Sequence, residues 1–267
     1  MAAHAEKDTD VDTRKKSQRK KKIILRLKTD DITETWTILR IAQQRAPIHW
    51  RKLFQDSIHD LKIISQEIEK SERRERIEIV PRKKDIFNAF HWTPLHEVKV
   101  VIMGQDPYPT ILSSGKPQAT GASFSTPREA PIQPSLRNIY QEVKNNYPHF
   151  DPPDHGDLRG WAQQGVLLLN SALSTHPGKK ESHIYLWLNF VKKVFKEIMR
   201  VRPKTIVLLW GRKAEDTIRF LGNLTYLTAG HPSPLNRQGG FIGCEHFKKV
   251  NDHLIKSGIK PVNWTKL

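Results

Sequence analysis

Several side chains able to take part in catalysis stand at the ends of short apolar runs. In "VVIMGQDPYPT" (residues 100–110) Asp106 is followed by a proline and then by Tyr108, while Asn170 ends "VLLLN" and His231 stands in "GHPSPL". Proline restricts the residue before it to extended backbone conformations. A carboxylate held in this way can orient water or stabilise a developing cation. A loop histidine can supply a hydrogen bond to a leaving group, and an asparagine can read an amide edge.

Each of these residues is also typical of an ordinary structural role. Asp-Pro is a common turn sequence, a single loop histidine often lies on the surface, and a final asparagine often closes a strand by binding backbone. Phe124 in "TGASFS" could stack on a planar ligand, although a loop phenylalanine usually belongs to the core. Taken singly, none of them identifies a site, so their meaning depends on the elements that position them.

The elements around these residues alternate between strand and helix patterns. Short apolar runs bounded by Gly, Pro or Asn predict strands buried on both faces, at residues 98–103, 166–169, 205–210 and 224–228. Helical spacing of apolar residues appears between them and ahead of the first. This alternation predicts an α/β fold with a central four-stranded parallel sheet flanked by helices on both faces. Ligands gather beyond the carboxyl ends of such strands, so the polar residues above are expected to converge there.

Charge and composition narrow the classes of partner. The chain of 267 residues has a formal net charge of +17, which points to a polyanion, most often nucleic acid. An anionic membrane surface is the second choice, and simple solubility explains such a charge as well. No apolar segment reaches the roughly 18 residues needed to span a bilayer. The single cysteine, Cys244, leaves no internal disulfide and no cysteine-built metal site. We expect a soluble protein of a reducing compartment, with no metal and no membrane partner.

The first segment differs from the rest in composition. Residues 1–29 are polar, and "RKKSQRKKKIILRLK" within them holds nine basic residues and no acidic one. This predicts a disordered basic arm ahead of a single catalytic domain over residues 30–267. The arm is typical of nuclear import or loose phosphate contact, and also of a solvated tail with neither role. Four acidic residues before the basic cluster argue against a mitochondrial presequence, so we expect a nuclear protein.

Longer motifs carry a resemblance to a known family. These are "VKVVIMGQDPY", "QATGASFS", "PSLRNIYQEV", "HGDLRGWAQQGVLLLN", "IVLLWG" and "HPSPLNRQGGFIGCEHFKKVN", with "KSGIKPVNW" near the end. In order and spacing they closely resemble family 1 uracil-DNA glycosylases over residues 31–267. The resemblance implies hydrolysis of the bond between N1 of uracil and C1′ of deoxyribose, which leaves an abasic site and begins base-excision repair. It also implies a flipped nucleotide, because the bond is inaccessible within a duplex.

The resemblance assigns two catalytic residues. Asp106 matches the aspartate that faces an oxocarbenium-like sugar and positions water. His231 matches the histidine that donates a hydrogen bond to uracil O2, a contribution on the order of 3 kcal/mol. No metal or organic cofactor is implied.

Uracil recognition is assigned to four further positions. Asn170 would read the O4 and N3–H edge, Phe124 would stack on the ring, and Tyr108 would exclude the methyl group of thymine. Gln105 would help to close the pocket.

Contacts to DNA are assigned to serine loops and their neighbours. Leu235 matches a residue that wedges into the duplex behind the flipped nucleotide, and its polar neighbours argue against a core role. The other matched positions are Ser135, Ser182, His183, Gly211, Arg212, Ser233 and Arg237. The expected partner is uracil-containing DNA, single- or double-stranded. Replication or processivity proteins are possible further partners, and the chain is expected to be a monomer.

Three positions depart from the family pattern. Pro109 stands where the family's "GQDPYH" has a histidine, so slower turnover is expected with the preference for uracil kept. The loop over residues 109–117 is longer than the family's usual form and includes Ile111 and Leu112. Arg212 replaces a small hydroxyl residue after "LLWG".

Two other functions remain open on the sequence. A DNA-binding accessory that kept the fold is supported by Pro109, the longer loop and the basic arm, and uracil release by the purified protein would separate it from an enzyme. A glycosylase with broader base specificity is disfavoured by Tyr108 and Asn170, since a relaxed pocket would lack the tyrosine barrier.

Overall fold

The computed structural model describes residues 36–267, and residues 37–267 form one compact unit. The basic arm expected over residues 1–29 lies outside the described residues and stays a prediction. In the part that is described, no helix combines the length and apolarity that a membrane crossing requires.

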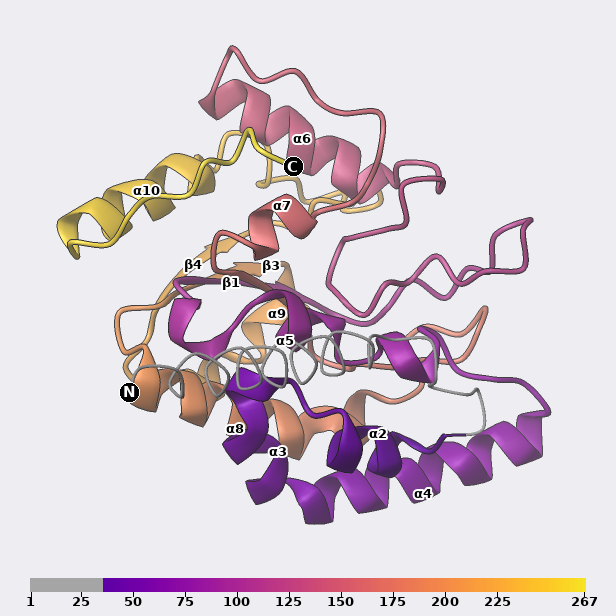
Figure 1. The fold of residues 1–267 in the computed structure, drawn as a ribbon. Coiled ribbons are helices and arrows are strands. Elements are labelled where there is room, and N and C mark those ends of the chain that lie inside the picture. Colours follow the sequence, from indigo (N-terminus) through magenta and orange to yellow (C-terminus); the bar gives the residue numbers. More distant parts are fainter. Residues whose placement is uncertain (1–35) are drawn as a thin grey trace, which may run out of the picture. The chain divides into compact units, whose positions relative to one another are not determined.

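Four short strands form a fully parallel sheet in the order β2-β1-β3-β4 (Figure 1). Their bounds are β1 Val100–Gly104, β2 Val166–Asn170, β3 Ile206–Trp210 and β4 Thr225–Ala229. Parallel neighbours need crossover connections, and helices supply them here. The predicted α/β class and the four-stranded parallel sheet are confirmed.

Helices cover both faces of this sheet, as predicted (Figure 1). On one face lie α6 Pro134–Asn146, α7 Arg159–Ala162 and α10 His246–Lys256. On the other lie α2 Ile38–Gln44, α3 Arg51–Asp56, α4 Ile58–Glu75, α5 Asn88–Trp92 and α8 Ile184–Val201. The short α9 Arg212–Glu215 follows β3, and 3-10 turns span Ile48–Trp50, Lys83–Asp85, Leu95–Glu97 and Ile218–Phe220.

One core cluster joins the sheet to α6 and α10. Val100 and Ile102 of β1 pack with Leu136 and Val143 of α6 and with Phe247 of α10, and all five are buried. Burying an apolar side chain of this size contributes about 1.5–3 kcal/mol. The carboxyl end of β1 is therefore held on a rigid platform.

An aromatic cluster fills the opposite face. Phe54 of α3 lies edge-on to Phe87 and to Phe190 of α8, with ring centroids 4.8 and 5.6 Å apart. Phe90 of α5 and Trp187 of α8 complete the cluster. Such pairs add about 0.5–1.5 kcal/mol each beyond their buried area. They fix the beginning of α8, and with it the end of the loop that follows β2.

The strand β4 differs from its prediction. Strands β1, β2 and β3 are buried along their whole length, whereas β4 is exposed or half-buried throughout. It pairs with β3 alone and forms an edge of the sheet. Tyr226 is 42% exposed. The expectation that this strand is buried on both faces is wrong, because an apolar run does not reveal strand order.

The loop between β4 and α10 is anchored to α6. The buried carboxylate of Glu142 accepts hydrogen bonds from the backbone N–H of Gly243 at 2.7 Å and of Glu245 at 2.9 Å. The side-chain amide of Asn138 donates to the carbonyl of Pro232 at 2.7 Å. Two turns of one helix thus hold both ends of this loop.

Candidate active site

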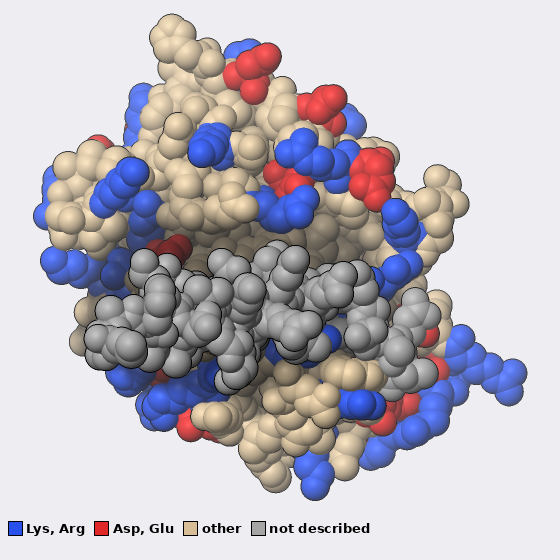
Figure 2. Space-filling view, viewed as in Figure 1, with Lys and Arg blue, Asp and Glu red and all other residues tan. Residues whose placement is uncertain are grey.

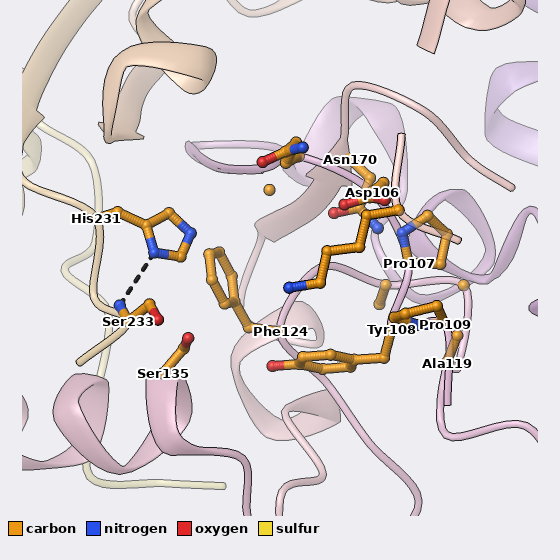
Figure 3. A pocket seen from close by; sticks show the side chains of 15 residues that line it. Asp106, Pro107, Tyr108, Pro109, Ala119, Phe124, Ser135, Asn170, His231 and Ser233 are labelled. Atoms are coloured by element: carbon orange, nitrogen blue, oxygen red, sulfur yellow. Dashed lines mark hydrogen bonds between the residues drawn. The ribbon is translucent and has the colours of Figure 1, made fainter. Parts of the chain in front are cut away.

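A pocket of about 150 Å³ opens at the carboxyl ends of β1 and β2 (Figure 3). Six separate stretches of the sequence line it. The predicted residues among its walls are Gln105, Asp106, Tyr108, Phe124, Ser135, Asn170, His231 and Ser233. The structure therefore brings together both predicted catalytic residues, all four predicted uracil-binding residues and two of the predicted phosphate contacts.

Asp106 is held at the exit of β1. Its Oδ2 accepts a hydrogen bond of 2.6 Å from the backbone N–H of Glu181, in the loop that follows β2. Burial raises the pKa of the Asp106 carboxyl, and the charge of Glu181 adds to the rise, while Lys180 and Lys213 oppose it. The carboxylate is thus partly desolvated and oriented from a second loop, which suits it to face a developing positive charge.

The imidazole of His231 is oriented for donation. Its Nδ1 accepts a hydrogen bond of 3.0 Å from the backbone N–H of Ser233, drawn as a dashed line in Figure 3. Burial lowers the pKa of His231, and the charge of Lys180 lowers it further. A neutral imidazole that accepts at Nδ1 carries its hydrogen on Nε2. His231 is therefore a neutral donor near pH 7.

Gly211 packs closely against His231. A Cβ placed on Gly211 would lie 2.9 Å from the Cβ of His231, and the φ of Gly211 is +90°. Both the space and the backbone conformation call for glycine. The sequence prediction gave Gly211 a phosphate contact only, and the structure adds this packing role.

Asn170 ends β2 directly opposite the end of β1. It pairs with Gly104 in the strand register and is 5% exposed. A Cβ on Gly104 would lie 2.1 Å from the Oδ1 of Asn170. The amide of Asn170 thus occupies space that only glycine leaves open. Sequence reasoning missed Gly104, although a glycine at the end of an apolar strand is the signal that could have found it.

Two aromatic rings form further walls of the pocket (Figure 3). Phe124 adopts a φ of +60°, which is a genuine outlier for a bulky residue. Its ring lies 5.7 Å from that of Trp210 and 6.4 Å from that of His231. Residues held in such conformations cluster at ligand sites. The hydroxyl of Tyr108 is buried without a hydrogen-bond partner among the described residues, and burial raises its pKa.

Lys180 is a wall residue that the sequence prediction did not include. It is exposed, and its charge lowers the pKa of both Asp106 and His231, so it lies near both groups. The neighbouring Glu181 pairs with Lys213 of α9, which ties this loop to the turn after β3. The signal available in the sequence was "GKKESH", with adjacent lysines in a loop that follows a buried strand.

A second hollow of about 660 Å³ adjoins the pocket and shares Gln105 and His231 with it. Four residues predicted to contact DNA line it: Gly211, Arg212, Leu235 and Arg237. The side chain of Leu235 is 83% exposed, so a core role is excluded. Ser233 accepts a hydrogen bond of 3.2 Å from the backbone N–H of Leu235, which shapes the turn that presents this leucine.

The predicted contact of His183 with DNA is wrong for its side chain. His183 is 3% exposed, and its Nδ1 hydrogen-bonds the hydroxyl of Ser174 at 2.9 Å. Its ring also packs edge-on against His176 at 4.8 Å. Burial lowers the pKa of His183 to about 4. The adjacent Ser182 is exposed, with its hydroxyl bonded to the carbonyl of Lys179, and its role stays a prediction.

The longer loop after Pro109 folds as a small hairpin. Ile111 forms a bridge with Pro117, and the backbone N–H of Leu112 donates to the carbonyl of Lys116 at 2.9 Å. The carbonyl of Pro109 accepts from the N–H of Gly178 at 2.8 Å. The hairpin is therefore an ordered segment that follows the pocket residue Pro109. Within residues 36–267, no group of His, Cys, Asp and Glu side chains is arranged to hold a metal ion.

Known proteins resemble this chain over most of its length. A profile of the Uracil DNA glycosylase superfamily matches residues 90–255. The uracil-DNA glycosylase of Dichelobacter nodosus is 43% identical over 219 residues, which cover 80% of this chain and 93% of that protein. That of Proteus mirabilis is 46% identical over 189 residues, or 70% of this chain and 81% of that protein.

Solved structures extend the likeness to three dimensions. Mimivirus uracil-DNA glycosylase superposes with a TM-score of 0.77 at 29% identity, over 85% of this chain and 88% of that one. A variant of the mimivirus protein in complex with UGI gives a TM-score of 0.76 at 29% identity, over 81% and 87%. With the profile covering more than half of its length, this chain belongs to the uracil-DNA glycosylase superfamily.

Proposed function

We propose that this protein is a uracil-DNA glycosylase that flips uracil out of DNA and hydrolyses its N1–C1′ bond. One observation carries the proposal: Asp106, His231, Asn170 and two aromatic rings meet in one pocket of about 150 Å³. The size suits a single flipped base rather than a duplex. The names of its relatives support the same activity.

The pocket separates two opposite charges along the bond that breaks. As the bond lengthens, positive charge develops on the sugar and negative charge on uracil. The carboxylate of Asp106 would stabilise the sugar cation and position water. The Nε2–H of His231 would donate to uracil O2, because its Nδ1 is already occupied by Ser233. Preorganised donors of this kind contribute on the order of 3 kcal/mol.

Selection of uracil would come from the remaining walls. Asn170 presents its amide at the edge of the pocket, with the Oδ1 pressed against Gly104. Cytosine would offer the opposite donor and acceptor pattern to that amide. Phe124 would stack on the ring. Tyr108 would occupy the space that the methyl group of thymine requires, while Leu235 would fill the gap left in the duplex.

The DNA-binding accessory is the second candidate, favoured by the hairpin and by Pro109. One assay separates the two: release of uracil from an oligonucleotide with a single uracil, by wild type and by Asp106→Asn. An enzyme releases uracil but neither thymine nor cytosine, and the variant is slower by roughly 100-fold or more. Tight DNA binding without release by either protein would establish the accessory instead.

We propose further that residues 1–29 direct the protein to the nucleus and that it acts as a monomer. The cluster of nine basic residues in this segment supports the first point. Fusing residues 1–29 to a fluorescent protein tests the nuclear localisation, since a fusion that stays outside the nucleus would refute it.

Sedimentation of the full chain tests whether the protein is a monomer. Replication proteins as further partners stay a prediction, to be tested by binding to purified processivity factors.

A further inference from the structure

A separate groove, which we call the lateral groove, lies beside the uracil pocket. It has a volume of about 460 Å³ and shares Ala119 with the pocket. Five cationic side chains line it against three carboxylates, a net charge of +2. The cations are Arg82, Lys84, Lys116, Arg128 and Arg159. None of them belongs to the catalytic machinery described above.

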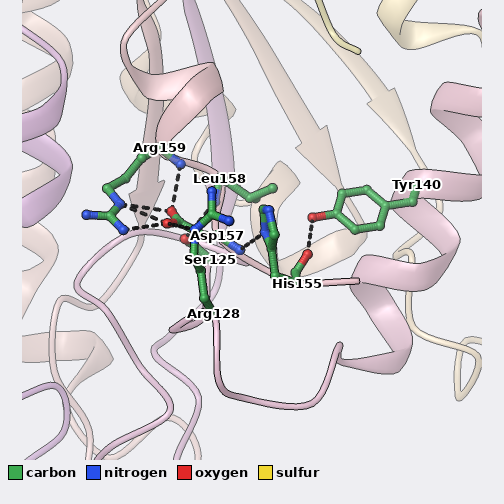
Figure 4. A network of polar contacts seen from close by, with 7 residues as sticks. All are labelled: Ser125, Arg128, Tyr140, His155, Asp157, Leu158 and Arg159. Carbon is green, nitrogen blue, oxygen red and sulfur yellow. Dashed lines mark hydrogen bonds and ion pairs between the residues drawn. The ribbon is translucent and has the colours of Figure 1, made fainter. Parts of the chain in front are cut away.

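Two of these cations pair with one buried carboxylate. Asp157 accepts hydrogen bonds from the Nε of Arg159 at 2.9 Å and from its Nη2 at 2.5 Å, and the Nε of Arg128 lies 3.5 Å away (Figure 4). The side chain of Asp157 is 6% exposed, whereas those of Arg159 and Arg128 are 54% and 60% exposed. The carboxylate thus orients two guanidinium groups while leaving them open to an anion.

The opposite wall carries further positive charge. Arg82 and Lys84 line it, and the charges of both lower the pKa of the neighbouring Asp85, against the effect of its burial. The hairpin over residues 110–118 contributes Lys116, whose Nζ lies 3.4 Å from Glu129. Pro109, just before this hairpin, lines the pocket, whereas Lys116 and Pro117 within the hairpin line the groove. The longer loop therefore contributes a wall to the groove.

The groove also offers an aromatic surface. Trp92 lines it, is half-buried, and lies under the guanidinium of Arg159 at 5.8 Å from the ring centroid. Thr126, a further wall residue, has a buried hydroxyl without a partner among the described residues. A positive groove that holds an aromatic ring with an arginine beside it is the composition that binds single-stranded nucleic acid.

We propose that the lateral groove binds the single-stranded continuation of the uracil-bearing DNA strand. The proposal rests on the proposed glycosylase function, since the same strand must deliver its uracil to the adjacent pocket. The groove and the pocket share Ala119, so the two hollows adjoin each other. Phosphates would meet the cations and an unstacked base would meet Trp92. A stiff duplex cannot offer such a base.

The test compares the double variant Arg82→Glu, Lys84→Glu with a control of equal charge change, Lys248→Glu, Lys256→Glu on α10. Both lysines of the control are exposed and line none of the three hollows described above. Uracil release is measured on a trinucleotide, on a single strand of about 15 nucleotides and on a blunt duplex of that length. The full chain is used throughout.

For the groove variant we expect KM on the longer single strand to rise about tenfold, with kcat and the trinucleotide kinetics within about twofold of wild type. The salt dependence of binding should weaken by about 0.7 in slope for each phosphate that the groove no longer neutralises. An unchanged KM, an equal rise in the control, or an equal rise on duplex would overturn the proposal. Failure of the glycosylase function itself would look different, because wild type would then release no uracil from any substrate.

Discussion

The uracil pocket and the lateral groove share the wall residue Ala119, yet their charged side chains differ in exposure to water. In the pocket, Asp106 and His231 are largely desolvated, and burial is the main cause of both pKa shifts. In the groove, Arg128 and Arg159 stay more than half exposed. Electrostatic interactions strengthen where water is excluded, and exposed cations attract a strand from solution. Catalysis and the proposed capture of a strand are thus assigned to adjacent but different environments.

The elements that form the two sites differ in the same way. The pocket is anchored at strand ends, where Gly104 and Asn170 pair within the buried sheet. The groove is formed by loops and short helices, with the hairpin as one wall. Lysine and arginine side chains appear over much of the face seen in Figure 2, with acidic groups among them. Position within a cavity, rather than charge alone, therefore distinguishes the groove.

A loss of activity as large as that expected for Asp106→Asn should follow from His231→Ala in the pocket. The variant loses the donor that faces uracil O2, so kcat should fall by roughly 100-fold while the salt dependence of DNA binding is unchanged. Single-turnover kinetics on single-stranded substrate measures this. His253→Ala on α10 serves as the control. A rise in KM with kcat preserved would show that His231 acts in binding, and the division between the two sites would fail.

A single methyl group should damage both sites at once. Gly121 lines the pocket with a φ of +83°, and a Cβ there would lie 1.8 Å from the carbonyl oxygen of Asp85, a wall residue of the groove. We expect Gly121→Ala to lower the free energy of unfolding by more than about 3 kcal/mol. Gly115→Ala is the matched control, because its φ is +75° but its Cβ meets nothing within 4 Å.

The control therefore isolates backbone strain from the clash. Gly115→Ala should cost about 1 kcal/mol, from the left-handed conformation alone. Thermal unfolding measures both, at about 2–4 °C per kcal/mol for a domain of this size. Equal shifts in Tm for the two variants would mean that the contact at Asp85 relaxes without cost.

Leu235→Ala should separate duplex from single strand. The exposed leucine has a role only where a base stack must be held open, so we expect kcat/KM on duplex to fall about tenfold. On single-stranded DNA the variant should stay within about twofold of wild type. Ile242→Ala, at another exposed apolar side chain, is the control. Equal losses on both substrates would contradict the wedge role.

The smallest expected effect concerns pH. Burial raises the pKa of Asp106. The midpoint of the acid limb in the profile of kcat/KM against pH should therefore lie above the usual aspartate pKa of 3.8. A lowered His231 pKa keeps the imidazole neutral above pH 6.5, so no loss is expected there. A raised folded-state pKa means that the stability from Asp106 is present at low pH and is lost as pH rises through that pKa.

Asp106→Asn should therefore raise the Tm at pH 7 slightly, although it slows uracil release by roughly 100-fold or more. It should leave the Tm nearly unchanged at acidic pH, where the native carboxyl is protonated. Thermal scans of both proteins at several pH values measure this difference. A variant that is less stable than wild type at pH 7 would show that the hydrogen bond from Glu181 outweighs the cost of burying the charge.

Local sequence was enough to predict the sheet, the superfamily and the centre of the pocket. Strands buried on both faces appear in the sequence as continuous apolar runs. The Asp106–Tyr108 turn follows such a run directly. Because ligands bind beyond the carboxyl ends of parallel strands, the position of this turn predicts the position of the site. Asn170 and His231 were found for the same reason. These signals are local, because each depends on only a few consecutive residues.

The packing of the loops could not be predicted from local sequence and became visible in the three-dimensional structure. It buried His183 against Ser174, placed Lys180 beside Asp106, and left β4 exposed at an edge. It also assembled the lateral groove from cations and an aromatic ring that stand up to about 80 residues apart. Such contacts join residues that share no sequence pattern. They are determined by the free energy of packing and desolvation across the whole fold, to which no single stretch of sequence corresponds.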